Sequence, residues 1–367
     1  MSGPECVNAI SGSYFLLFKT ILMKKMILAV PASLFLIVII LPFLLLKFMY
    51  RQNSNTNNAQ LAANYATPSY CVSPDAKNII FAGVGRGGAD IYAYDLMTNN
   101  IKTLLQTDDV EYWPSISQDG KKIVFCAKPK GSSAWRLRTL ELKTGIVTTL
   151  TNSNDASGSY PQYSPNGKQI IFTRGTRLRG YVFGGEIWND VDVCEIDNDG
   201  SNFRQLSSLK YYSTDPPVPI SNGDIYFSAW LPYPSTSNNL YKIVHNVNSN
   251  PVMVGPPTTI ESGSLAPDGK MFLAIAPTDG KFKYEIEEFT LLSAPQSVRV
   301  NKVFNSRSYS SYPMSPKYSP DKRFIYFLGD PNSFDKPDLM KLDSLTGKIT
   351  KVISYSRFLN PLGNSSK

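Results

Sequence analysis

Short apolar runs recur along the chain, and each one follows a turn. Residues 123–125 (Ile-Val-Phe) are β-branched or aromatic, which is typical of a buried strand. Just before them, Asp119 and Gly120 favour a tight turn, because Asp bonds nearby backbone and Gly accepts positive φ. Another short strand pattern, residues 114–117, precedes the turn, so the stretch predicts a β-hairpin.

This hairpin pattern occurs six times. The versions are SPDAKNIIF from Ser73, SQDGKKIVF from Ser117, SPNGKQIIF from Ser164, SNGDIYF from Ser221, APDGKMFLA from Ala266 and SPDKRFIYF from Ser319. The fourth version is shortened. The predicted second strands end at Phe81, Phe125, Phe172, Phe227, Ala274 and Phe327, in steps of 44 to 55 residues.

Two more strand patterns follow each hairpin, as in residues 135–142 and 146–150. Four antiparallel strands in each unit of about 40–50 residues are typical of a propeller blade. The sequence therefore predicts an all-β, six-bladed β-propeller over residues 65–355, followed by a tail over residues 356–367.

The six motifs resemble those of the TolB-like family of six-bladed β-propellers, which are built from WD40-like Pro-Asp repeats. The resemblance covers about residues 67–354. It implies the fold and, since the family is periplasmic, a location outside the inner membrane of a bacterium. It leaves the function open, because the same propeller serves adaptors and domains of enzymes.

The N-terminal region has a different pattern. Residues 26–46 are uncharged and apolar, which is long enough to span a bilayer as a single-pass anchor. Three lysines precede this run and two basic residues follow it, so the charge bias favours a cytoplasmic segment over residues 1–25. A cleaved secretory signal is the alternative, and Met23 is a candidate start of translation. Residues 47–64 are polar and Asn-rich, and predict a flexible linker.

Charge and composition exclude several kinds of chemistry. The net charge of +8 is mild for 367 residues, and no nucleic-acid-binding motif is present. His245 is the single histidine, and no Gly-x-Ser-x-Gly motif occurs, so neither a Ser-His-Asp triad nor a histidine-cluster metal site is expected. The four cysteines have no spacing typical of a disulfide or metal site. We therefore expect no cofactor and no metal.

The candidate site follows from strand direction. Strands alternate in direction, so the Pro-Asp-Gly turns lie on one face and the longer, more variable connections lie on the other. Arginines and aromatic residues, which are common at binding surfaces, gather in those connections. The candidate binding residues are Arg174, Arg177, Arg179, Tyr181, Trp188, Tyr112, Trp113, Tyr160, Trp230 and Tyr233. Alternatively, individual aromatic residues pack between blades or close the central channel.

These features predict a non-catalytic module that binds a protein partner in the cell envelope. The alternative is an enzyme that acts on envelope or extracellular glycans through paired carboxylates. Acidic residues in the variable connections are Asp108, Asp109, Glu111, Asp155 and Glu186, and their spacing singles out no pair. A purely structural role is a third hypothesis.

Overall fold

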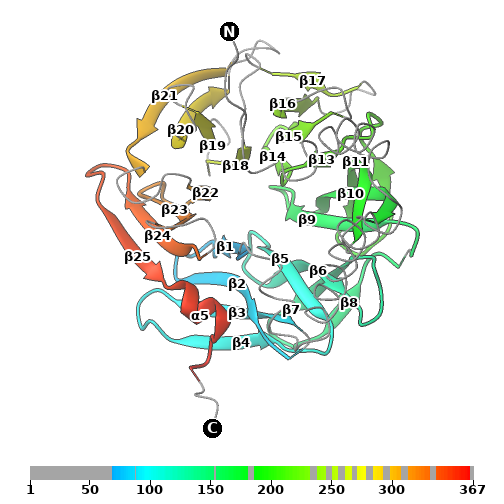
Figure 1. The fold of residues 1–367 in the computed structure, drawn as a ribbon, viewed down its shortest axis with the longest axis horizontal. Coiled ribbons are helices and arrows are strands. Elements are labelled where there is room, and N and C mark those ends of the chain that lie inside the picture. Colours follow the sequence, from blue (N-terminus) through cyan, green and yellow to red (C-terminus); the bar gives the residue numbers. More distant parts are fainter. Residues whose placement is uncertain are drawn as a thin grey trace, which may run out of the picture. The chain divides into compact units, whose positions relative to one another are not determined.

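The computed structural model describes most of the chain beyond residue 67. The described residues are 68–86, 88–152, 154–180, 186–231, 238–244, 250–254, 261–266, 271–277, 284–291, 298–306, 313–330 and 336–363. They form six antiparallel sheets and one short helix. The sheets are arranged around a common centre, and the first strand of each sheet is the innermost (Figure 1). This arrangement is an all-β propeller.

The first three sheets follow one another along the chain. The first contains β1 (Tyr70–Val72), β2 (Asn78–Val84), β3 (Ala89–Asp95) and β4 (Ile101–Leu105). The second contains β5 (Val110–Ile116), β6 (Lys122–Lys128), β7 (Arg136–Glu141) and β8 (Val147–Thr149). The third contains β9 (Ser157–Tyr163), β10 (Gln169–Gly180), β11 (Glu186–Asp197) and β12 (Arg204–Gln205).

The remaining sheets continue in the same order. The fourth contains β13 (Ser213–Thr214), β14 (Val218–Pro219), β15 (Ile225–Trp230), β16 (Asn238–Ile243) and β17 (Val252–Met253). The fifth contains β18 (Glu261–Leu265), β19 (Met271–Pro277), β20 (Tyr284–Leu291) and β21 (Val298–Phe304). The sixth contains β22 (Met314–Tyr318), β23 (Phe324–Gly329), β24 (Asp338–Asp343) and β25 (Ile349–Ile353), and α5 (Tyr355–Leu359) follows it.

One set of hydrogen bonds explains the repeated Ser-Pro-Asp-Gly motif. In the second sheet, the Ser117 hydroxyl donates to Asp119 Oδ1 (2.6 Å) and accepts from the Lys122 N–H (3.0 Å). Gly120 supplies the left-handed conformation of the turn, with φ +69°. The same hydroxyl-to-side-chain bond is present in the pairs Ser73–Asp75 (2.6 Å), Ser164–Asn166 (2.8 Å) and Ser319–Asp321 (2.5 Å). The motif therefore closes the hairpin through its own side chains.

The aromatic residue that ends the motif forms the core between sheets. Five such side chains are at most 1% exposed: Phe81, Phe125, Phe172, Phe227 and Phe327. Each lies on a second strand, between two neighbours in its own sheet. Sequence position in the repeat thus fixes packing position in the fold.

The fourth sheet departs from the pattern at its first strand. Two short strands, β13 and β14, both pair with β15 in place of one continuous strand. Pro216 and Pro217 lie between them, and a proline has no N–H to donate to a ladder. The Asp215 carboxylate accepts a hydrogen bond from the Ser228 hydroxyl of β15, which holds the interrupted segment against the sheet.

The last described segment packs against the first sheet. Residues from 356 onward were expected to be a tail, but α5 places Phe358 edge-on to Phe81, with ring centroids 5.2 Å apart. The Arg357 guanidinium donates to the Asn99 carbonyl (3.1 Å). All four strands of the sixth sheet come from consecutive sequence, and the helix adds a contact between the last and first sheets.

In the part of the chain described here, no helix has the length and apolar character needed to cross a bilayer. The expected anchor (residues 26–46) and linker (residues 47–64) lie outside the described residues, as does Cys6.

Candidate functional site

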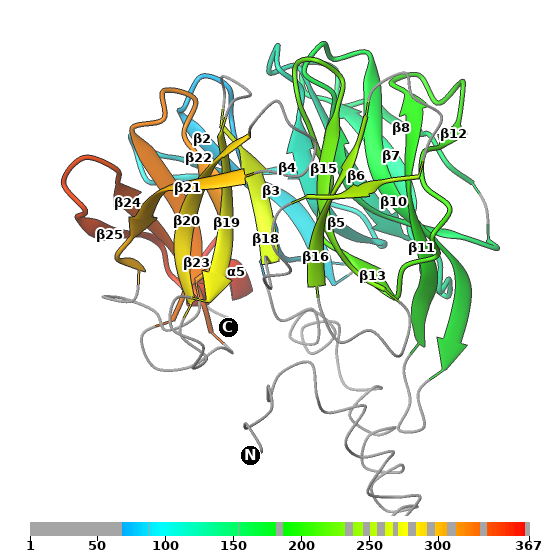
Figure 2. The ribbon, with the colours of Figure 1, turned by 90° about the horizontal axis from the view of Figure 1, so that it is seen from above.

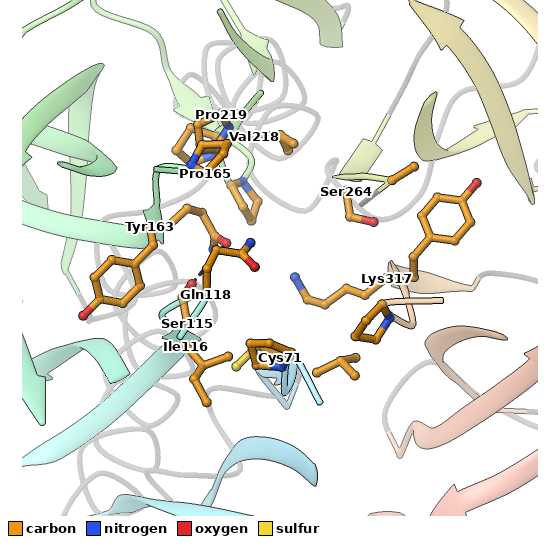
Figure 3. A pocket seen from close by; sticks show the side chains of 18 of the residues that line it. Cys71, Ser115, Ile116, Gln118, Tyr163, Pro165, Val218, Pro219, Ser264 and Lys317 are labelled. Carbon is orange, nitrogen blue, oxygen red and sulfur yellow. Dashed lines mark hydrogen bonds between the residues drawn. The ribbon is translucent and has the colours of Figure 1, made fainter. Parts of the chain in front are cut away.

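A cavity of about 300 Å³ lies at the centre of the propeller, near the ends of the first strands that carry the Pro-Asp-Gly turns. Six of its lining residues occupy one equivalent position: each pairs with the next-to-last residue of the repeat motif on the neighbouring strand. We call them the channel ring, and they are Cys71, Ser115, Gln162, Val218, Ser264 and Lys317. Each sheet therefore contributes one side chain to the lining of the cavity. Cys71, Ser115, Val218, Ser264 and Lys317 are labelled in Figure 3.

A local irregularity precedes the ring residue in three sheets. Trp113, Tyr160 and Ser315 have φ of +52°, +52° and +50°, and each comes directly before a proline. The pairing register of β5, β9 and β22 shifts at these points. A left-handed non-glycine residue costs about 1 kcal/mol or more, so it persists only where the surroundings require it. The bulge redirects the strand just before the residue that lines the cavity.

Among the described residues that line the cavity, Lys317 is the one charged side chain. Its side chain extends into the middle of the cavity, and its Nζ lies 5.8 Å from the centroid of the Tyr70 ring (Figure 3). Burial lowers the pKa of Lys317, and the neighbouring Cys71 opposes that effect. Within the described residues Lys317 makes no ion pair, and none of the lining residues is Asp or Glu.

Neutral hydrogen-bonding groups surround this amine. Ser115 Oγ lies at the limit of hydrogen-bonding distance from Gln162 Oε1 (3.5 Å), and Gln118 extends into the cavity from the adjacent turn. Ser264 Oγ is buried and has no partner in the part of the protein that the structure describes. Burial raises the pKa of the Cys71 thiol to about 12, so this thiol is neutral near pH 7.

The third sheet carries a different feature at the other end of its strands. The expected loop over residues 174–190 is instead largely strand: β10 and β11 are each 12 residues long and pair from Gln169↔Asp197 to Gly180↔Glu186. β9 ends opposite Gly175, so residues 176–180 and 186–189 continue as a two-stranded ribbon. Figure 2 shows β10 and β11 extending past the ends of the neighbouring strands.

The ribbon separates the predicted arginines. Arg177 and Arg179 are exposed and alternate with Leu178, so they share one side of β10. Arg174 lies before the ribbon, and its guanidinium packs over the Phe203 ring at 5.5 Å from the centroid. The structure therefore brings Arg177 and Arg179 together and places Arg174 apart from them.

Trp188 anchors the ribbon to the second sheet. Its indole N–H donates to the Ser133 carbonyl (2.8 Å), and it pairs across the ribbon with Leu178, which is 38% exposed. At Gly175 an added Cβ would lie 2.7 Å from Trp188 Cβ, so glycine allows the two strands to approach closely there.

The other predicted aromatic residues lie in two places. Trp113 contacts Tyr112, Tyr160 and Trp135, with ring centroids 5.3, 4.7 and 5.1 Å away. Tyr112 and Trp135 belong to the buried core, while Trp113 and Tyr160 are half-buried. Trp230 lies at the end of β15, in another sheet.

Tyr181 and Tyr233 lie outside the described residues, and so does His245. The cysteines Cys71, Cys126 and Cys194 are free thiols. Among the residues that the structure describes, no three His, Cys, Asp or Glu side chains come close enough together to hold a metal ion.

Four sheets use an acidic residue at one equivalent register position of the third strand: Asp90, Asp192, Glu285 and Asp338. All four are buried. Each accepts a hydrogen bond from the segment that follows the fourth strand, for example from the Lys210 N–H (3.2 Å), the Ser306 N–H (3.0 Å) or the Tyr355 N–H (2.8 Å). These acids tie each sheet to the connection that leads onward, which is a structural use of the carboxylate.

The acidic residues proposed for glycan chemistry have varied surroundings. Glu111 is fully buried, and burial, with a smaller contribution from nearby Asp90, raises its pKa to about 8. Asp109 forms an ion pair with Arg138 (2.8 Å). Asp108 and Asp155 are exposed, and the side chain of Glu186 lies outside the description.

The sequence analysis did not predict the channel ring, because the six Pro-Asp-Gly turns look alike and only the variable connections suggested a binding site. The available signal was the alignment of the six repeats, in which the ring position varies from Val to Gln to Lys; it lies two residues before five of the motifs and three before the shortened fourth. A position that varies within otherwise regular repeats is where such a protein can differ in binding.

Comparison with known proteins supports the fold. No family model matches the chain. Over 72 residues, the chain is 42% identical to the Tol-Pal system protein TolB of Francisella tularensis subsp. mediasiatica. That match covers 20% of this chain and 16% of the length of the relative.

Solved structures extend the likeness to most of the propeller. TolB from Acinetobacter baumannii superposes with a TM-score of 0.55 at 16% identity, over 77% of this chain and 62% of that chain. An oligogalacturonate lyase from Vibrio parahaemolyticus superposes with a TM-score of 0.54 at 14% identity, over 78% and 77% of the two chains. The protein thus has a TolB-like β-propeller fold, which these other proteins share.

Proposed function

We propose that this TolB-like propeller is six-bladed and acts as a non-catalytic module that binds a protein partner in the cell envelope. The observation that carries the proposal is the ribbon of the third sheet. It projects from the end of the strands opposite the turns, and its exposed residues include Arg177, Leu178 and Arg179.

The ribbon has the properties of a protein-recognition element. Among the described residues, no strand pairs with the outer edges of residues 176–180 and 186–189. Free strand edges can accept an extended segment of a partner through backbone hydrogen bonds. Arg177 and Arg179 add two positive charges, against the one acid, Glu186, in residues 176–180 and 186–189, so an acidic partner segment fits best.

The aromatic residues have a supporting role in this proposal. Trp188 fixes the ribbon to the Ser133 carbonyl, which restricts its orientation before a partner binds. Trp113 and Tyr160 are half-buried at the cluster between the second and third sheets. Tyr112 packs beneath Trp113 and supports it from the buried core. Trp230 lies at the end of β15 in the next sheet.

The proposed location is the periplasmic side of the inner membrane, with residues 26–46 as the anchor and residues 47–64 as the tether. The apolar run, the charge bias and the likeness to TolB support it. A tethered propeller can reach a partner in the envelope while it remains attached to the membrane.

A glycan-cleaving enzyme remains the alternative, since the fold is shared with an oligogalacturonate lyase. Such chemistry needs two convergent carboxylates that reach the substrate. Asp90 and Glu111 are near each other, yet both are fully buried. The buried acids of the third strands are bonded to the propeller's own backbone, which favours the binding role.

A crosslinking pull-down from envelope fractions tests the proposal. We expect Arg177→Ala/Arg179→Ala to reduce capture of the partner at least five-fold relative to the wild-type protein. Two single variants serve as matched controls: Arg174→Ala, because Arg174 packs on Phe203, and Arg204→Ala, which removes an exposed arginine paired with Glu195 in the same sheet. Both should capture the partner like the wild type.

Equal capture by the double variant and the wild type would remove the ribbon from the interface. Cleavage of a cell-wall or extracellular glycan by the purified protein would refute the non-catalytic role itself. The two outcomes are independent, so the site and the class of function are tested separately.

A further inference from the structure

The channel cavity is a site that the protein-binding role does not use. It lies near the turn ends of the strands, whereas the ribbon extends from the other end of β10. Its volume of about 300 Å³ is at the lower limit for small-molecule pockets. An occupant would therefore have the size of a single sugar or a small organic acid.

The charge in the cavity sets the first requirement on an occupant. Lys317 extends into the cavity with no ion pair among the described residues, and no described residue of the lining is Asp or Glu. A desolvated ammonium group is costly unless an anion or hydrogen-bond acceptors compensate for the lost water. The single positive charge of Lys317 would be neutralised by a ligand that carries one anionic group.

The neutral groups set the second requirement. Ser115 and Gln118 lie on one side of the amine, and Ser264 lies on the other (Figure 3). Gln162 also lines the cavity, next to Ser115. Ser264 Oγ is buried and unpartnered within the described chain, so it has a free donor and acceptor. Hydroxyls and amides of this kind match the hydroxyl groups of a ligand.

The rim supplies few further donors. Its residues include Pro74, Pro165 and Pro320 from the turns and Pro216, Pro217 and Pro219 from the interrupted strand. Prolines have no N–H, so these segments cannot form a backbone cradle for an anion. The anionic group must therefore be held by Lys317.

We propose that the channel ring binds a small hydroxylated monocarboxylate, with its carboxylate on Lys317 and its hydroxyls on Ser115, Gln162 and Ser264. Cys71 lies beside the amine on the neighbouring first strand and closes that side of the site. Because the thiol is protonated near pH 7, it adds no competing negative charge.

Calorimetric titration of the full-length protein in detergent micelles tests the proposal with four probes. D-Gluconate carries both a carboxylate and hydroxyls, sorbitol lacks the carboxylate, hexanoate lacks the hydroxyls, and sulfate is a simple anion. We expect gluconate to bind at least ten-fold more tightly than each of the other three at matched ionic strength. Sulfate binding equal to that of gluconate would overturn the ligand class, since the site would then be a general anion site.

Variants locate the binding. Lys317→Met should weaken gluconate binding at least ten-fold, and Ser264→Ala should weaken it about three-fold. Lys168→Met is the matched control, because Lys168 is an exposed lysine on the turn of the third sheet and lines no part of the cavity. Unchanged gluconate affinity in a folded Lys317→Met protein would refute the proposal.

A second measurement needs no variant. Lys317 lines the cavity, whereas Lys168 is exposed on a turn outside it. Gluconate should slow acetylation of the Lys317 amine by sulfosuccinimidyl acetate, resolved by mass spectrometry, and sorbitol should not, while Lys168 should react equally in every sample. Equal Lys317 acetylation with and without saturating gluconate would place gluconate outside the cavity and overturn the assignment. Neither readout involves the ribbon, so this site can fail while the protein-binding role stands.

Discussion

The two ends of the strands use carboxylates in opposite ways. At the turn end, Asp75, Asp119 and Asp321 face solvent, and hydrogen bonds from the motif serines and nearby N–H groups lower their pKa values. At the other end, Asp192 and Glu111 are buried, and burial raises their pKa values. The same functional group is held ionised at one end and moved toward the protonated form at the other.

The difference follows from what each carboxylate holds. The turn acids bond within four residues of themselves, so they stabilise a local hairpin that would be solvated in any case. Among the buried acids, Asp192 and Glu285 bond across 15 to 21 residues, to the segment that leads into the next sheet. Substitution of a turn acid should therefore destabilise only its own hairpin, whereas substitution of a buried acid should weaken the contact between sheets.

The largest effect is expected at Asp192. Its carboxylate accepts hydrogen bonds from the Ser207 hydroxyl (2.7 Å) and the Lys210 N–H (3.2 Å). Asp192→Ala leaves these donors buried or misdirected, which should lower the free energy of unfolding by about 2–3 kcal/mol. Urea unfolding measures the change, with Asp192→Asn as the matched variant that keeps one acceptor and should lose less. A loss below about 0.5 kcal/mol in the Ala variant would mean that the buried acids do not hold the sheets together.

The next largest effect is a pH dependence at Glu111. Burial, with a smaller contribution from nearby Asp90, raises its folded-state pKa to about 8 from an ordinary value of 4.5. Because the pKa of Glu111 is higher in the folded state, this carboxyl ionises at a lower pH in the unfolded chain. The folded state therefore keeps its full stability below about pH 4.5 and loses stability as the pH rises from 4.5 toward 8. The wild type should therefore lose stability across this window, by up to about 1.4 kcal/mol per pH unit.

Glu111→Gln removes the titrating group and keeps an acceptor for the Thr107 hydroxyl (2.5 Å). It should flatten the profile between pH 5 and 8 by on the order of 2 kcal/mol in total. Glu141→Gln, at a partly exposed acid of β7, is the control and should leave the profile unchanged. If the free energy of unfolding falls equally with pH in wild type and Glu111→Gln, the fall does not come from ionisation of Glu111, and this prediction is wrong.

The sequence was informative about the turn end of the strands and much less so about the other end. The Ser-Pro-Asp-Gly hairpins and the buried Phe positions such as Phe125 are local patterns, and each appears in the structure where the repeat places it. The position of Lys317 in the same repeat was equally visible. That it faces a cavity depends on the bulge at Ser315, and a left-handed serine before proline has no signature in sequence.

The other end depends on contacts between segments distant in sequence. Residues 176–180 lack strong apolar alternation, so a loop was expected where pairing with β11 produces a strand. Arg174 and Arg177 are close in sequence, yet packing on Phe203 separates the first from the ribbon. Trp113 and Tyr160 belong to different repeats, and their contact requires two sheets to be placed side by side.

A moderate effect is expected at the motif serines. Ser319 Oγ donates to Asp321 Oδ1 (2.5 Å) and accepts from the Phe324 N–H (2.9 Å). Ser319→Ala should lower the free energy of unfolding by about 1 kcal/mol, since the hydroxyl satisfies a backbone donor that the hairpin leaves free. Ser221→Ala is the control, because Ser221 is exposed in the shortened fourth turn. Equal melting temperatures for both variants would show that the hydroxyl network adds nothing to stability.

The smallest change in stability is expected for substitution of Asp119, because the third sheet already has Asn at the equivalent turn position. In the third sheet Asn166 stands in the same turn position and accepts from both the Ser164 hydroxyl (2.8 Å) and the Lys168 N–H (2.9 Å). Asp119→Asn preserves both acceptor contacts, so stability at pH 7 should change by less than about 0.5 kcal/mol.

The same substitution should change the response to acid. The pKa of Asp119 is lowered by the bonds from Ser117 and the Lys121 N–H, so the carboxylate stabilises the folded state above pH 3.8 and loses that contribution as the pH falls. Thermal melts at pH 7 and pH 3 should show a smaller acid-induced drop for Asp119→Asn than for wild type. The Asp119 side chain is 56% exposed to solvent, so the difference should be small, and Asp119→Asn combined with Asp321→Asn should double it. An unchanged acid response in the double variant would mean that the turn carboxylates serve only as neutral acceptors, as Asn166 does.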